Sequence, residues 1–133
     1  MAIAGIEQGR ASYAFSCASE GKKLEKDKEY KSYVRKIPTL IRTNGLGATL
    51  AFVRSKAKGD TKEKGFAYKV IYAQIAQWLE QKGLIEDGQN KELVEKVVAL
   101  NSTEYRLLTN EVLSLFKWLA RFAEALIEGE VSE

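Results

Sequence analysis

Residues 101–129 read NSTEYRLLTNEVLSLFKWLARFAEALIEG. The apolar residues of this stretch alternate at spacings of four and three: Leu108, Val112, Leu115, Leu119, Phe122 and Leu126. Such a seam is typical of a helix that packs against other helices. Asn101 followed by Glu104 matches a capping box, and Gly129 suits the C-terminal end of a helix. The stretch therefore predicts one long amphipathic helix that Asn101 begins and Gly129 ends.

Helical patterns also cover most of the chain before this stretch. We predict helices over about 3–19, 28–43, 46–58, 66–82 and 90–99, and no convincing strand. Pro38 lies inside the second segment and predicts a kink or two abutting helices, and Asn44-Gly45 suits its end. The fold class expected is all-α, a single compact bundle of about six helices that forms one domain over residues 1–133.

The composition suits a protein of the cell interior. Hydrophobic residues make up 45% of the 133 residues, which is enough for a core, yet no apolar run is long enough to span a membrane. The N-terminal residues do not form the apolar segment of a secretory signal. Cys17 is the only cysteine, so an internal disulfide is excluded, and its place on an apolar helix face predicts a small buried hydrophobe. We expect a cytoplasmic protein.

The residue inventory argues against catalysis. The chain has no histidine, which removes the commonest general base and the commonest metal ligand. Gly45-Leu46-Gly47 is too short for a phosphate-binding loop. The remaining alternative is a metal-dependent nuclease built from Asp60 with Glu80-Gln81-Lys82, but such nucleases aim their ligands from strands. We therefore expect no enzyme, no metal, no cofactor and no small-molecule substrate.

Charge is distributed unevenly along the chain. From Lys22 to Lys69 there are fourteen Lys and Arg against five Asp and Glu, whereas from Val70 onward there are six against eleven. This asymmetry predicts a surface for a polyanion, and the alternative is a solvated basic surface without a partner. Lysines dominate, which favours phosphate contacts that ignore base sequence. The predicted nucleic-acid-binding residues are Arg35, Lys36, Arg42, Arg54, Lys56, Lys58, Lys62 and Lys64.

Aromatic residues interleave with these lysines. Tyr30, Tyr33 and Phe66 are candidates for stacking on nucleotide bases. Tyr30 and Phe66 also occupy core spacing, so packing is the favoured interpretation for those two.

The second, third and last helical segments resemble a known family. The stretches concerned are Tyr33-Val34-Arg35-Lys36-Ile37-Pro38, Ile41-Arg42-Thr43-Asn44-Gly45-Leu46-Gly47, Leu50-Ala51-Phe52-Val53, Tyr105-Arg106, and the pattern Leu115, Lys117-Trp118-Leu119, Arg121-Phe122-Ala123. Together they resemble the small α-helical subunit of type III-B CRISPR effector complexes, the Cmr type, over essentially the whole chain. The resemblance implies a non-catalytic subunit with a role in antiviral defence. It also implies stacking with copies of itself and with other subunits around a guide RNA–target RNA duplex.

Two other functions remain open from the sequence. One is a helical protein–protein adaptor without nucleic-acid contact. The other is a free-standing DNA- or RNA-binding regulator, which requires sequence preference and is disfavoured by the lysine-rich composition.

Overall fold

The computed structural model describes residues 2–86 and 91–131. Over these ranges the chain forms six helices and no strand: α1 (Ala2–Lys22), α2 (Asp27–Asn44), α3 (Leu46–Lys56), α4 (Gly65–Gln81), α5 (Leu93–Val98) and α6 (Ser102–Leu126). The predicted all-α bundle is confirmed. The predicted start of the fifth helix, at residue 90, lies outside the described residues. No helix in the described ranges has the length and hydropathy that a membrane span requires.

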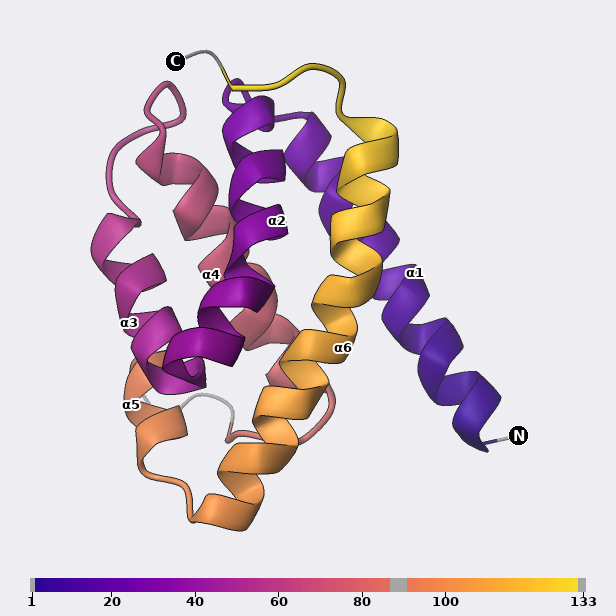
Figure 1. The fold of residues 1–133 in the computed structure, drawn as a ribbon, viewed down its shortest axis with the longest axis vertical. Coiled ribbons are helices and arrows are strands. Elements are labelled where there is room, and N and C mark those ends of the chain that lie inside the picture. Colours follow the sequence, from indigo (N-terminus) through magenta and orange to yellow (C-terminus); the bar gives the residue numbers. More distant parts are fainter. Residues whose placement is uncertain (1, 87–90, 132–133) are drawn as a thin grey trace.

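The helices pack around one shared core (Figure 1). α6 runs antiparallel to α2 and packs against both α1 and α2. α4 lies behind α2 in this view and contacts α1, α2 and α3, as expected for its broad apolar surface. The short α5 lies below α3 and leads into α6. α2 therefore separates two surfaces, one shared with α3 and α4 and the other shared with α6.

The ends of α6 match the sequence prediction at one end only. The Asn101 side chain accepts a hydrogen bond from the Glu104 backbone N–H at 2.9 Å, which is the predicted N-terminal cap. The predicted end at Gly129 is wrong, because the helix stops at Leu126 and Ile127 is extended. Ile127 is buried, and its carbonyl accepts a hydrogen bond from the Lys31 Nζ at 3.1 Å. This docking on α2 draws the chain away from the helix axis.

α2 is one continuous helix that contains Pro38, so the alternative of two abutting helices is wrong. It ends at Asn44 as predicted, and Gly45 has a φ of 91°, a conformation that favours glycine. The next glycine, Gly47, lies against α6: its N–H donates to the Tyr105 hydroxyl at 2.7 Å. Two stretches that carry the family resemblance are therefore joined by a hydrogen bond.

A buried network of polar hydrogen bonds joins α1, α2 and α4. The Tyr30 hydroxyl donates to the Gln74 Oε1 at 2.6 Å, and the Gln74 Nε2 donates to the Cys17 carbonyl and to the Glu20 carboxylate. Cys17 is buried as predicted, and burial raises the pKa of its thiol to about 12. Gly21 lies directly against the Tyr30 ring, where a Cβ atom would come within 2.3 Å of ring carbons. No side chain fits at this position without displacing the ring.

Candidate nucleic-acid interface

Two of the eight predicted residues lie on one aromatic cluster. The Lys36 Nζ of α2 is 5.2 Å from the Tyr33 ring centre, 5.5 Å from that of Phe52 and 5.6 Å from that of Tyr68. The Lys56 Nζ of α3 is 5.8 Å from the Phe52 ring centre. We call Tyr33, Lys36, Phe52, Lys56 and Tyr68 the lysine–aromatic face. Residues from three helices meet there, so only the tertiary fold assembles it.

The rings of this face hold one another in place. Tyr33 and Tyr68 stack with centres 3.7 Å apart and planes 11° apart, and Phe52 meets Tyr68 edge-on at 6.0 Å. Burial raises the pKa of both tyrosines to about 12, so both phenols are neutral at physiological pH. Both lysines are exposed. The face therefore presents two cations and no anion of its own.

Tyr68 was not singled out from the sequence. The signal was present in Phe66-Ala67-Tyr68-Lys69, where aromatic residues continue to alternate with a lysine. Tyr30, a candidate for base stacking, is fully buried, and its hydroxyl donates a hydrogen bond to Gln74. The packing interpretation is therefore confirmed for Tyr30.

The loop after α3 returns toward the lysine–aromatic face. A Cβ atom on Gly65 would lie within 2.6 Å of the backbone oxygens of Lys56 and Lys58, so the backbone of Lys64 is adjacent to these residues. Lys62 and Lys64 are exposed on the same loop. The fold thus gathers the backbone positions of three predicted lysines, residues 56, 58 and 64.

Arg35 lies on the other side of α2 and is paired with carboxylates. Its guanidinium pairs with Glu124 of α6 and with Glu130 of the C-terminal tail, both at 3.2 Å. Lys31, one helical turn before Arg35, is buried and also pairs with Glu130, at 3.1 Å. Hydrogen bonds from Lys31 and Arg35 lower the pKa of the Glu130 carboxyl. Lys31 and Arg35 of α2 therefore hold the C-terminal tail.

Arg54 is also paired with a carboxylate. Its Nε lies 2.9 Å from the Glu92 carboxylate, which accepts a second hydrogen bond from the Tyr72 hydroxyl at 3.0 Å. These two hydrogen bonds lower the pKa of Glu92, so the carboxylate stays ionised. Lys58 lines the same shallow hollow as Arg54, together with Glu92 and Glu95. The hollow is therefore mixed in charge.

Arg42 stands apart from the other predicted residues. It lies near the end of α2, beside α6, and is exposed. Within residues 2–86 and 91–131, no carboxylate forms an ion pair with Lys36, Arg42, Lys56, Lys58, Lys62 or Lys64. The structure thus divides the eight predicted residues into two paired arginines and, within those ranges, six unpaired cations.

The carboxylates considered for a nuclease do not meet. Asp60 precedes the N-terminus of α4 and Glu80 lies near its C-terminus, so about 22 Å of helix separates them. The nearest basic partner of Glu80 is Lys96, at 3.7 Å. Among the described residues, no cluster of three metal-ligating side chains is present.

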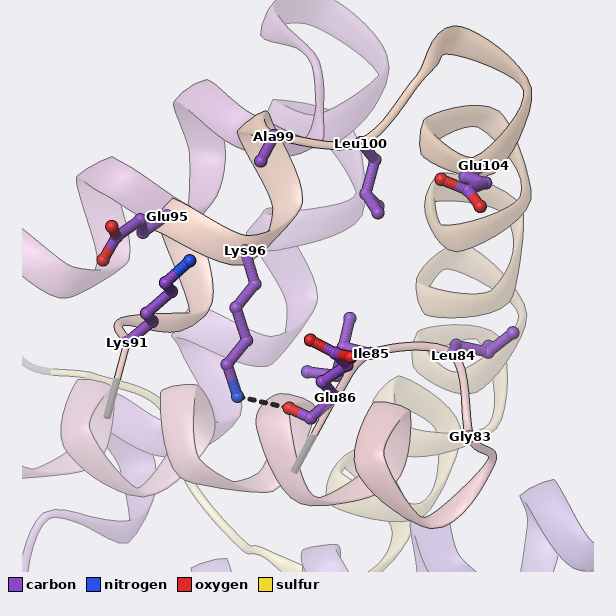
Figure 2. Close-up of a pocket in the computed structure, with 10 residues that line it drawn as sticks. All are labelled: Gly83, Leu84, Ile85, Glu86, Lys91, Glu95, Lys96, Ala99, Leu100 and Glu104. Atoms are coloured by element: carbon purple, nitrogen blue, oxygen red, sulfur yellow. Dashed lines mark hydrogen bonds between the residues drawn. The ribbon is translucent and has the colours of Figure 1, made fainter. Parts of the chain in front are cut away.

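A separate hollow lies where α4, α5 and α6 approach one another (Figure 2). Glu86, Glu95 and Glu104 share its lining with Lys91 and Lys96. The Lys96 ammonium points at the backbone carbonyl of Glu86, as Figure 2 shows. Mixed charge and an engaged lysine make this hollow a poor match for a polyanion.

Comparisons with known proteins agree with the resemblance in the sequence. The sequence model of the CRISPR-associated protein family Cas_Cmr5 matches residues 6–126. The chain is 36% identical over 118 residues to the CRISPR system Cmr subunit Cmr5 of Thermus thermophilus, a match that covers 89% of this chain and 92% of that protein. It also resembles the crystal structure of a CRISPR-associated Cmr5 family protein from Thermus thermophilus, with a TM-score of 0.72 and 34% identity. That likeness covers 92% of this chain and 97% of the other.

Proposed function

The chain belongs to the Cas_Cmr5 family of CRISPR-associated proteins, and from that premise we propose that it is a cytoplasmic, non-catalytic small subunit of a Cmr RNA-targeting complex that contacts RNA. In this role it stacks with copies of itself and with neighbouring subunits, while other subunits cut. The observation that carries the RNA contact is the lysine–aromatic face, where the Lys36 and Lys56 ammonium groups lie over Phe52 without a carboxylate partner in the described chain.

The chemistry of this face suits an RNA backbone. Lysine ammonium groups bind phosphate as point charges and do not read bases, which gives salt-dependent and sequence-independent binding. Cation–π contacts with the rings favour the observed positions of the two ammonium groups, by about 0.5–1 kcal/mol at an exposed site. Lys62 and Lys64 extend the positive charge along the adjacent loop.

Arg35 and Arg54 take a smaller part in this proposal. Each already has a carboxylate partner, at 3.2 Å and 2.9 Å respectively. A phosphate has to displace or share that partner, so the net gain from either arginine is smaller than from an unpaired lysine.

The experiment removes the two lysines of the face together. Complexes reconstituted with Lys36→Ala/Lys56→Ala should bind target RNA more weakly, and the slope of log affinity against log salt should fall by between about 1 and 2 units. Lys22→Ala/Lys23→Ala is the matched control, because it removes two exposed lysines at the end of α1. Subunit stoichiometry checks that each variant enters the complex.

The outcome separates this function from the main alternative. If the Lys36→Ala/Lys56→Ala complex keeps the parent's affinity and salt slope, the face is solvated. The interpretation as a helical adaptor without nucleic-acid contact then replaces the proposal.

A further inference from the structure

A third hollow lies on the side of α2 opposite the lysine–aromatic face, in the angle between α2 and α6. Its lining includes Pro38, Arg42, Leu113, Ser114, Lys117 and Ala120. Arg42 lies on α2 and Lys117 on α6, and Pro38, Leu113 and Ala120 contribute apolar side chains to the lining. Among the residues that the structure describes, no acidic side chain lines this hollow. Figure 1 shows α2 and α6 side by side along this region.

The positive charge continues along α6. Arg106, Asn110, Lys117 and Arg121 are exposed and follow one another at spacings of four, seven and four, which places them on one side of the helix. From Arg106 to Arg121 this row extends roughly 22 Å. It ends at Glu124, whose carboxylate pairs with Arg35.

The cations of this surface have no internal partner in the described chain. Over residues 2–86 and 91–131, no carboxylate forms an ion pair with Arg42, Arg106, Lys117 or Arg121. Three of the four are arginines, whereas the lysine–aromatic face has none. A guanidinium donates in a planar fork that matches two oxygens of one phosphate, and it is desolvated more easily than an ammonium. The apolar side chains beside these cations lower the local dielectric relative to bulk water, which strengthens such pairs.

We infer that the hollow between α2 and α6, with Arg42, Lys117 and Arg121 around it, is a second binding surface for an RNA phosphate backbone. This inference rests on the proposed function, which supplies RNA as the polyanion, but it places the contact on the side of α2 away from the lysine–aromatic face. Here the arginine guanidinium groups would donate to phosphate oxygens of an RNA strand, beside the apolar side chains of the lining. Two separate surfaces on one subunit allow it to touch two different segments of RNA.

The first test compares double variants in the reconstituted complex. Arg42→Ala/Lys117→Ala should weaken target-RNA binding at least about fivefold at roughly 100 mM salt and lower the salt slope by between about 1 and 2 units. Arg42→Lys should restore only part of the affinity, because it keeps the charge and loses the fork. Combining the double variant with Lys36→Ala/Lys56→Ala should give slope changes that add, as expected for separate surfaces.

The second test maps what occupies the hollow. Ser114→Cys provides a thiol in its lining for a photo-crosslinker, and the native Cys17 does not compete because it is buried. Ala99→Cys, in the mixed-charge hollow of Figure 2, is the matched control. Position 114 should crosslink to RNA in the assembled complex, and position 99 should do so much less.

The outcomes distinguish the two proposals. An Arg42→Ala/Lys117→Ala complex with the parent's affinity and slope overturns the second surface. So does loss of this variant from the complex, or crosslinking of position 114 to protein alone, since the hollow is then an interface for an acidic protein surface. If instead only the Lys36→Ala/Lys56→Ala complex matches the parent's affinity and salt slope, the lysine–aromatic face is refuted. The hollow between α2 and α6 then remains as the RNA-binding surface.

Discussion

The pairing of α1 with α6 gives a sharp test of how this bundle is stabilised. The Arg10 guanidinium makes two hydrogen bonds to the Glu111 carboxylate, both at 2.9 Å. The Trp78 Nε1 of α4 donates to the same carboxylate at 2.8 Å. Glu111 thus joins three helices that are distant in sequence. We predict that Glu111→Gln, which keeps the shape and removes the charge, is strongly destabilising.

The magnitude follows from burial and from the number of hydrogen bonds. The Arg10 and Glu111 side chains are 17% and 12% exposed, so water replaces the lost partner poorly. Breaking a buried ion pair costs about 3–5 kcal/mol, and hydrogen bonds to charged groups are worth about 1.5–3 kcal/mol each. Glutamine retains one acceptor oxygen, so we expect Glu111→Gln to lower the unfolding free energy by about 2–3 kcal/mol. In a domain of this size that lowers Tm by roughly 10 °C.

The effect should depend on pH in a defined direction. Burial opposes ionisation of Glu111, but the hydrogen bonds from Arg10 and Trp78 outweigh it and lower the pKa of the carboxyl below 4.5. A carboxyl whose pKa is lower in the folded than in the unfolded state contributes its full stabilisation above the unfolded pKa. That stabilisation is lost as the pH falls through the folded pKa. The difference in unfolding free energy between the parent and Glu111→Gln should therefore be largest at about pH 7 and shrink below about pH 4.5.

Urea unfolding followed by circular dichroism measures the difference. Glu124→Gln is the matched control, because Glu124 also pairs with an arginine across helices but is 61% exposed. Exposed pairs contribute about 0–1 kcal/mol, so this control should stay near the parent. A Glu111→Gln protein within about 0.5 kcal/mol of the parent at neutral pH, or a gap that widens as the pH falls toward about 3, would refute the reasoning.

Three further predictions concern local packing. Gly21→Ala should lower the unfolding free energy by about 1–3 kcal/mol in urea titrations, because the added methyl group meets the Tyr30 ring. Gly9→Ala, where nothing lies within 4 Å, should be neutral or stabilising by up to about 1 kcal/mol, and equal effects at the two sites would contradict this account. Tyr105→Phe should cost about 1 kcal/mol in the same titrations, since the Gly47 N–H loses its acceptor, and an unchanged midpoint would argue against that role. Cys17 should react slowly with a thiol reagent at mildly alkaline pH in the native state and rapidly after unfolding, because burial raises its pKa to about 12; rapid native labelling would show an accessible thiol.

The main fold features could be predicted from local patterns. The buried seam of α6 from Leu108 to Leu119 and the Asn101 cap depend only on residues within the helix and its first turn, and the structure has both. The last two predicted seam residues, Phe122 and Leu126, are half-buried, and Ala123 is buried instead. The end of α2 at Asn44 follows from the φ of 91° at Gly45, a local property of glycine. The end of α6 could not be predicted in this way, because Ile127 leaves the helix to bury its side chain and to bond with Lys31, ninety-six residues earlier.

The candidate site was predictable in composition and not in arrangement. Arg35 and Lys36 are neighbours in sequence and equally basic, yet α2 points one at Glu124 and the other at Phe52. Lys117 lies in the acidic C-terminal half, where the count of charge along the chain gives no basic surplus. It shares a hollow with Arg42 only because α6 packs against α2. Nothing local to a lysine or arginine says which carboxylate lies opposite.

The sequence by itself determined that the chain is helical, that it lacks histidine, that it has a basic middle and an acidic end, and that it resembles the Cmr small subunit; the family match bears out the resemblance. Those properties depend on residue type and short spacing, which act within a few turns of helix. The tertiary structure alone decided which cations of the described chain remain unpaired. An ion pair forms with a carboxylate that lies within about 4 Å in space. For Arg35 and Arg54 that carboxylate is 38 or more residues away in the chain. Helix packing, and not composition, therefore leaves Lys36, Lys56, Arg42 and Lys117 available for a partner.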